Sequence, residues 1–240
     1  FNTKIKDIYK IEALVLKSII IMAIPLMLNE VLWSTGQTVF IQAYSTRGEN
    51  AYAAANITSA ISQLIFVVFG GISTGIAVMV GNTLGENKLE TAVDNSKKLI
   101  FAAMVTSFVM GLLLFVASFF IMDIYDVLDE TKRYAEFNIR VNALIVPVLA
   151  FNVSMYFTLR SGGDTRSTFL MDSGYMWVAQ VPTVILLSRL TTLTMPMLFL
   201  IVQLLEIPKM LFAYTRYRKG HWVRNLAIAN EDNARVLSEG

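Results

Sequence analysis

The chain carries no charged residue between Glu49 and Glu86, and none again between Lys98 and Asp123. An α-helix rises about 1.5 Å per residue, so about 20 apolar residues cross the hydrocarbon core of a bilayer, which is about 30 Å thick. Both uncharged stretches are longer than this, and neither is compatible with a helix on the surface of a soluble protein. The chain is therefore predicted to be a helical membrane protein.

Six apolar segments follow one another along the chain. They are residues 14–42, 51–84, 99–122, 138–159, 169–187 and 193–214. The last two each contain a proline, which membrane helices tolerate, and the short connector between them favours an antiparallel pair. The predicted fold class is an all-α membrane protein with a six-transmembrane-helix bundle.

The composition agrees with this class, because 55% of the 240 residues are hydrophobic and 16% are charged. The expected organisation is a cytoplasmic, amphipathic lead-in at residues 1–13, the bundle at residues 14–217 and a cytoplasmic tail at residues 218–240. The chain begins with Phe1, and we expect it to be a piece of something larger.

The Lys and Arg residues indicate the orientation of the segments. If the segments alternate in direction, fourteen basic residues up to Arg224 fall on one side of the membrane and four on the other, with Arg140 inside the fourth segment left out. Positively charged loops stay on the cytoplasmic side. The prediction is a multi-pass protein of the plasma (cytoplasmic) membrane, with both termini of this fragment cytoplasmic.

Several function classes are disfavoured by the composition. The net charge is +2 and no basic run has interleaved aromatic residues, so we expect no nucleic-acid partner. No enzyme activity is expected either. Gly162-Gly163-Asp164 is similar to a motif of membrane aspartyl proteases, but Ser161 stands where that motif has glycine, and the chemistry needs a second carboxylate facing the first within the membrane. The zinc motif His-Glu-x-x-His is also absent.

Glu30 lies near the middle of the first apolar segment. A charge at that depth costs about 2.5 to 3.5 kcal/mol on insertion scales, so such residues usually face a bundle interior or a wet cavity and handle ions, protons or substrate. The alternative is a protonated or amide-paired glutamate that holds two helices together.

A stripe of polar side chains surrounds Glu30. Ser34 and Gln37 follow it at i+4 and i+7 on the same helix face, and Asn29 and Trp33 lie beside it. A proton or Na⁺ would neutralise the carboxylate, and Asn29, Ser34 and Gln37 could supply oxygens to a hard cation. A cationic drug would compete for the same charge.

The second and fourth segments also carry polar lines with helical spacing. The residues expected to line a wet central cavity are Trp33, Asn56, Gln63, Asn142, Asn152 and Tyr156. The alternative is that these amides form hydrogen bonds between helices, each worth about 0.6 kcal/mol in a membrane bundle.

Three separated motifs carry a resemblance to a known family. They are Pro25-Leu-Met-Leu-Asn-Glu-Val-Leu-Trp-Ser-Thr-Gly36, Gly81-Asn-Thr-Leu-Gly-Glu-Asn-Lys88 and Arg160-Ser-Gly-Gly-Asp-Thr-Arg166. With Glu206, Lys209 and the run at residues 218–222, they resemble the C-terminal half of a MATE (multidrug and toxic compound extrusion) transporter over residues 14–226.

The resemblance implies helices seven to twelve of a twelve-helix protein with two bundles. Its partners would be the N-terminal six-helix half, membrane lipid and small organic substrates. It implies an antiporter that exports organic, often cationic and amphipathic, compounds in exchange for Na⁺ or H⁺, without any other cofactor. The acidic residue of the seventh helix, tied to coupling or substrate binding in several branches, is Glu30 here, where Na⁺ could bind. The fourth segment lacks the aspartate that some branches carry in the tenth helix, which leaves the coupling ion open.

Two further groups of residues are expected to be structural. Gly162, Gly163, Asp164 and Arg166 would form a cytoplasmic turn in which Asp164 caps a helix or pairs with an arginine. Glu206 and Lys209 would form a surface ion pair. Two alternative functions remain: a flippase for lipid-linked precursors, for which Arg140 is the single basic residue inside a span, and a half-transporter that is inactive alone.

Overall fold

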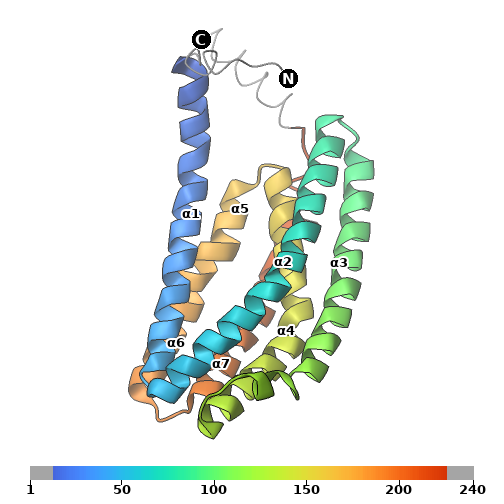
Figure 1. Cartoon of the computed structure of the whole chain (residues 1–240). Coiled ribbons are helices and arrows are strands. Elements are labelled where there is room, and N and C mark those ends of the chain that lie inside the picture. The colour runs from blue at the N-terminus through green and yellow to red at the C-terminus, as the bar shows by residue number, and fades with distance from the viewer. Residues whose placement is uncertain (1–12, 226–240) are drawn as a thin grey trace, which may run out of the picture.

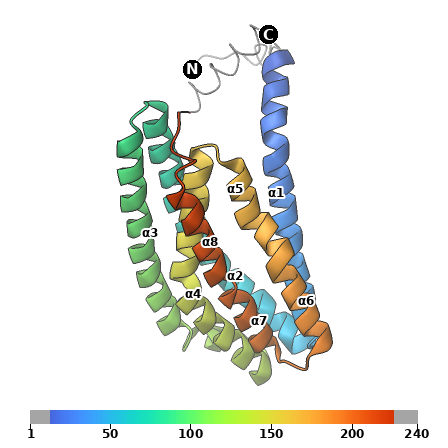
Figure 2. The same cartoon turned by 180° about the vertical axis from the view of Figure 1, so that it is seen from behind.

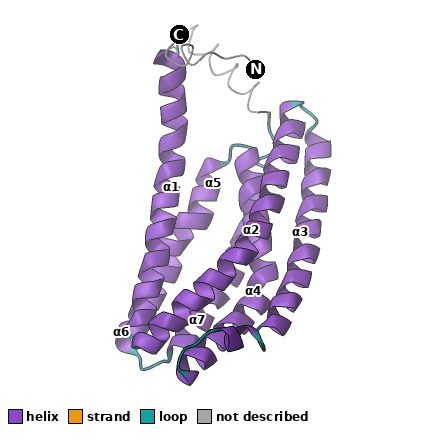
Figure 3. Cartoon of the chain, viewed as in Figure 1, coloured by secondary structure: helices purple, strands orange, loops and turns teal. Residues whose placement is uncertain are grey.

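The computed structural model describes residues 13–225, and within that range the chain is built from helices without any β-strand (Figure 3). Six long rods run along the bundle (Figure 1). Each of the six apolar segments predicted from the sequence lies largely in one of these rods, so the all-α membrane fold class is confirmed. The predicted lead-in at residues 1–13 and the tail beyond residue 225 lie outside the described residues, apart from Ala13.

The first four rods are single helices, and the last two are divided. The single helices are α1 (Ala13–Ser45), α2 (Glu49–Gly85), α3 (Leu89–Ala117) and α4 (Asp129–Ser161). The fifth rod joins α5 (Thr165–Phe169), the π-helical turns η3 (Leu170–Gly174) and η4 (Met176–Gln180), and α6 (Val181–Leu190). The sixth joins α7 (Met195–Leu204) and α8 (Glu206–Arg218), and the short 3₁₀ helix η2 (Ile121–Ile124) precedes α4.

Four helices of the described chain are long and apolar enough to cross a membrane. They are α2, α3, α4 and the α7–α8 rod. The fifth rod is a series of shorter helical elements, because Pro182 lacks the N–H that would bond the carbonyl of Val178, and π-helical turns precede it. These helices support a multi-pass membrane protein.

Large apolar side chains cover the outside of the bundle. Leu64, Val67 and Phe101 are each at least 70% exposed, and Phe108 is 65% exposed. Soluble proteins rarely expose apolar surface on this scale, and such surfaces mark contact with lipid or with another protein.

Helix α4 lies at the centre and packs against α2, α3, α7 and α8, whereas α1 lies beside the fifth rod (Figures 1 and 2). One apolar cluster of the core joins α2 and α4 through residues such as Ile61 and Ile139. A second joins the other ends of the same helices through Ile76 and Leu159, and includes Trp222, which is 1% exposed. The chain after α8 therefore packs back onto the bundle.

Helices α3 and α4 approach closely at Gly111. A Cβ atom on Gly111 would lie 2.5 Å from the backbone oxygen of Ala143. That carbonyl is four residues before Pro147, which has no N–H to donate to it. Glycine therefore permits the contact at the point where proline has freed a backbone acceptor.

Candidate functional site

Glu30 lies on the exposed side of α1 and makes no hydrogen bond or ion pair with another described residue. Because α1 is a continuous helix, Ser34 and Gln37 share its face as the spacing predicts. Ser34 is exposed, Gln37 is half-buried and Trp33 is 38% exposed. The stripe is therefore accessible in this chain, and its carboxylate has no counter-charge among the residues that the structure describes.

Asn29 faces the interior of the bundle and is 4% exposed. Its Nδ2 donates to Oδ2 of Asp172 at 2.9 Å, and its Oδ1 accepts a hydrogen bond from Oγ of Ser173 at 2.7 Å. Consecutive residues of a helix point about 100° apart, so Asn29 and Glu30 face different surroundings. The structure thus places Asn29 in contact with the fifth rod, and its predicted role as an oxygen ligand of a cation at Glu30 remains a prediction.

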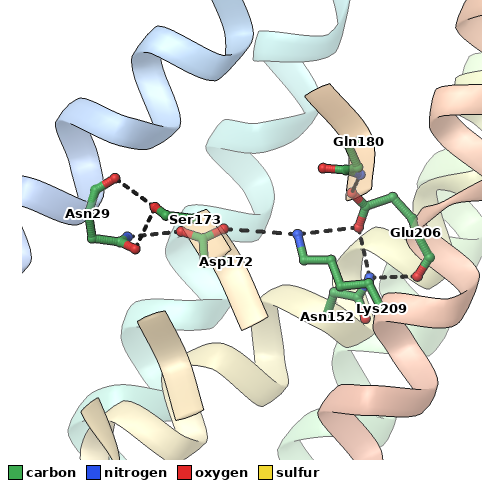
Figure 4. A network of polar contacts seen from close by, with 7 residues as sticks. All are labelled: Asn29, Asn152, Asp172, Ser173, Gln180, Glu206 and Lys209. Atoms are coloured by element: carbon green, nitrogen blue, oxygen red, sulfur yellow. Dashed lines mark hydrogen bonds and ion pairs between the residues drawn. The ribbon is translucent and has the colours of Figure 1, made fainter. Parts of the chain in front are cut away.

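Asn29 opens a network of polar contacts that crosses the bundle (Figure 4). Lys209 on α8 places its Nζ 3.9 Å from Oδ1 of Asp172 and 3.5 Å from Oε2 of Glu206. Glu206 also accepts hydrogen bonds from Gln180 Nε2 at 2.7 Å and from Asn152 Nδ2 at 2.8 Å. Four rods therefore meet in one continuous set of contacts.

Glu206 and Lys209 form the predicted ion pair, but its predicted place at the surface is wrong. Glu206 is 7% exposed and Lys209 is 9% exposed. Both residues face α4 and the fifth rod, because α8 presents positions i and i+3 on the same side, toward the bundle. The pair belongs to the interior.

Asp172 was missed by the sequence analysis, although it lies within the fifth apolar segment. The argument that singled out Glu30, a carboxylate inside an apolar span, applies equally to Asp172. Asp172 lies in the π-helical turn η3, and π-helical turns inside α-helices often mark functional sites.

Two of the cavity-lining candidates, Asn142 and Asn152, lie between helices. Asn142 donates to Oγ of Ser62 on α2 at 2.6 Å and accepts a hydrogen bond from Gln203 on α7. Asn152 donates to Glu206, as described above. Both are fully buried, so both make the interhelical bonds that the packing alternative expects.

The remaining candidates are less enclosed. Asn56 is half-buried and donates to the backbone oxygen of Tyr52 on its own helix, and Gln63 is exposed. Tyr156 is half-buried, accepts a long hydrogen bond from Nη1 of Arg160 at 3.4 Å and lies within electrostatic range of Asp172 and Glu30.

The turn between α4 and α5 combines capping with a close backbone contact. Oδ1 of Asp164 accepts the backbone N–H of Ser167 at 3.2 Å, Gly163 adopts φ 71°, and Arg166 is exposed. A Cβ atom on Gly162 would lie 1.8 Å from the backbone oxygen of Trp222. Only glycine fits there, which explains its place in this turn.

Comparison with known proteins adds two findings. The family model MatE matches residues 25–186. A protein of Thermotoga maritima named "Probable multidrug resistance protein NorM" is 21% identical over 173 residues, which cover 72% of this chain and 37% of that protein. The chain thus spans little more than a third of the length of this relative.

The family match includes the Glu30 stripe on α1, the whole of α2 to α4 and most of the fifth rod. It covers well over half of the chain, and it agrees with an all-helical bundle whose outer surface carries many exposed apolar side chains. This chain belongs to the MatE family.

Proposed function

We propose that this chain is the C-terminal bundle of an efflux transporter that exports organic, often cationic and amphipathic, compounds in exchange for Na⁺ or H⁺. Its partner would be an N-terminal six-helix bundle of the same protein. The proposal extends to this chain what the name of its Thermotoga maritima relative says of that protein, multidrug resistance. It also places the transporter in the plasma membrane, with both ends of this bundle cytoplasmic.

One observation carries the proposal. Glu30 places a carboxylate within an apolar helix, and this carboxylate is exposed and has no counter-charge among the described residues. An intramembrane charge without a partner is costly and normally serves a cation or a proton. Ser34 and Gln37, one and two turns further along, would contribute neutral oxygens of the kind that hard cations prefer.

Exchange follows from competition for this carboxylate. A cationic compound and a coupling cation cannot both neutralise a single negative charge, so binding of one favours release of the other. Exchange of one monovalent cation for another moves no net charge, so the concentration gradient of the coupling ion drives it. A hundredfold gradient supplies about 2.7 kcal/mol. That is enough to accumulate a substrate about a hundredfold across the membrane, because about 1.4 kcal/mol corresponds to a factor of ten.

The first prediction is that Glu30→Gln in the complete protein abolishes ion-coupled efflux. The amide keeps the size of the side chain but cannot carry the charge for which ion and substrate compete. Efflux of a cationic dye from vesicles with separately imposed Na⁺ and pH gradients measures the effect and identifies the coupling ion.

Glu86→Gln is the matched control, because Glu86 is an exposed acid in the loop after α2. It pairs with Lys88 at 2.8 Å, and the hydrogen bond from Lys88, with its charge, holds the pKa of Glu86 below its usual value. This control should retain wild-type efflux. Efflux by Glu30→Gln with unchanged Na⁺ and pH dependence would refute the role of Glu30.

A flippase for lipid-linked precursors is not favoured by the geometry at Arg140. Its Nη2 lies 3.2 Å from Glu136, its Nε donates to Ser118 and its guanidinium lies 4.5 Å from the centre of the Phe119 ring. A guanidinium that is already paired on α4 is a poor receptor for a pyrophosphate.

A further inference from the structure

The middle of α1 is held by a narrow contact with the fifth rod. Among the described residues from Ile24 to Thr38, only Asn29 and Gly36 are buried, and both face the π-helical turns η3 and η4. The other described residues of this part of α1, with Glu30 among them, are half-buried or exposed. The rotation of this part of α1 about its own axis therefore depends on the contact with η3 and η4.

Asn29 supplies the side-chain part of this contact (Figure 4). Its Nδ2 donates to Oδ2 of Asp172 at 2.9 Å, and Oγ of Ser173 lies 2.7 Å from its Oδ1 and 3.0 Å from its backbone oxygen. Asn29 is 4% exposed and Ser173 is 1% exposed. Both ends of the amide are thus engaged by η3 in a buried place, where the loss of a partner is costly because water does not replace it.

About one turn further along, η4 contacts the backbone of α1. The indole Nε1 of Trp177 donates to the backbone oxygen of Leu32 at 3.0 Å. Within the helix this carbonyl bonds the N–H of residue 36, and because residue 36 is glycine, no side chain is added beside it. A Cβ atom on Gly36 would overlap the sulfur of Met176, which is buried. Asn29, Leu32 and Gly36, spaced i, i+3 and i+7, therefore form one line of contact, the α1 seam.

The π-helical turns bring the partners of the α1 seam toward one side of the fifth rod. Residues five apart in an α-helix, such as Asp172 and Trp177, point about 140° apart. The i→i+5 hydrogen bonds of a π-helix bring such residues closer to one face. The irregular part of the fifth rod thus suits the contact with α1.

The fifth rod is itself anchored on the sixth rod. The hydroxyl of Tyr175 donates to the backbone oxygen of Leu205 at 2.9 Å, and Nε2 of Gln180 donates to Oε1 of Glu206 at 2.7 Å. Tyr175 and Gln180 are again five residues apart. The α1 seam is therefore fixed to a rod that is held from its other side.

The α1 seam decides which way Glu30 points, because Glu30 follows Asn29 directly. A rotation of α1 by one residue, about 100°, would turn Glu30 to the place of Asn29, beside Asp172 and away from the exposed face. We propose that Asn29 and Trp177 are positioning residues for Glu30, because they bond α1 to the fifth rod in the rotation that keeps Glu30 exposed. The role of Glu30 in exchange rests on the function proposed above, but the rotation of α1 does not.

Electron paramagnetic resonance of spin labels along α1 tests this rotation without any transport. In a complete protein whose only cysteine is the introduced one, a nitroxide is attached in turn at several exposed positions of α1. The accessibility of each label to a water-soluble paramagnetic agent follows the turns of the helix, so its maximum reports the wet face of α1. The labelled variants are Val31→Cys, Trp33→Cys, Ser34→Cys, Thr35→Cys and Thr38→Cys.

Asn29→Leu and Trp177→Phe should each shift this maximum along the helix. Trp177→Phe keeps an aromatic ring and loses only the N–H donor, so it decides the test where Asn29→Leu fails to fold. Asn142→Leu is the matched control, because it also removes amide bonds between helices, but its partners Ser62 and Gln203 lie on α2 and α7. This control should leave the wild-type maximum in place.

Efflux of a cationic dye at increasing concentrations of the coupling ion tests the effect on Glu30. Both seam variants keep Glu30, so the half-maximal ion concentration should rise while efflux at saturating ion stays near the wild-type rate. The rise should reach about threefold in Trp177→Phe and about tenfold in Asn29→Leu, because these remove one and two interhelical hydrogen bonds. A merely structural role would lower the amount of working protein, and with it the maximal rate.

The positioning role is overturned if the accessibility maximum stays in place in Trp177→Phe, or if Asn142→Leu shifts it equally. It is also overturned if Glu30→Gln abolishes coupling while both seam variants keep the wild-type half-maximal ion concentration. A shifted maximum together with unchanged coupling in Glu30→Gln would refute the proposed function alone, and the α1 seam would still fix the rotation of α1.

Discussion

Lys209 shows how one side chain can connect a bundle. Its ammonium lies between a carboxylate on η3 and a carboxylate on its own helix, and each of these is held by an amide from another rod. Glu30, one position from Asn29, has no such partner in the part of the chain that the structure describes. On α1, Asn29 therefore joins the helix to the fifth rod, whereas the neighbouring Glu30 is exposed and charged.

The buried amides allow a prediction of stability. Asn142→Leu should lower the free energy of unfolding by about 1 to 2 kcal/mol, since hydrogen bonds between membrane helices average about 0.6 kcal/mol and Asn142 makes two, to Ser62 and Gln203. The melting temperature of the purified complete protein measures the loss.

Asn56→Leu is the matched comparison, because Asn56 bonds only to the backbone of its own helix. It should change the melting temperature much less. If Asn142→Leu were as stable as wild type but failed to transport, Asn142 would act in the cavity and not in packing.

Prolines and π-helical turns interrupt two of the rods, and they do so in different ways. In the fifth rod, Pro182 and the preceding π-helical turns interrupt the regular pattern where Asp172, Ser173 and Gln180 meet their partners. In α4, Pro147 frees the carbonyl of Ala143, and α3 approaches that carbonyl with a glycine. Each interruption lies at a contact between helices.

The contact at Gly111 gives a second stability prediction. Gly111→Ala should destabilise the protein, because the new Cβ atom would meet the backbone oxygen of Ala143, which cannot move aside as a flexible side chain would. Gly75→Ala should leave the melting temperature unchanged or slightly higher, because a Cβ atom there has no neighbour within 4 Å. Equal melting temperatures for the two variants would contradict the close contact.

The bundle as a whole is organised around α4, with α1 beside the fifth rod (Figure 2). Its outer surface is apolar, and the basic loops predict its direction in the membrane. The Glu30 stripe lies on an exposed part of α1, which is where we propose that the second bundle faces it.

The orientation is testable because the chain contains no cysteine. In a complete protein without cysteines, Arg133→Cys should react with a membrane-impermeant maleimide added to intact cells, and Lys88→Cys should react only after the cells are permeabilised. The reverse pattern would place the termini of this bundle outside the cell.

Local properties of the chain were sufficient to predict the helices, their expected orientation and the polar face of α1. Apolar runs of membrane length specify the helices, their basic flanks predict the orientation, and the helical period places Glu30, Ser34 and Gln37 on one face. Hydropathy and period act over a few turns of helix, and they can be read without knowing which helices touch.

The partner of each buried polar group depended instead on the packing of distant segments. Asn29 meets Asp172 across 143 positions of the chain, and Asn152 meets Glu206 across 54. The sequence placed Glu206 and Lys209 on one helix face, but whether that face looks outward or toward α4 follows from how the rods pack. The network of polar contacts that joins Asn29, Asn152, Asp172, Glu206 and Lys209 arises only when the side chains of four rods come together in one place.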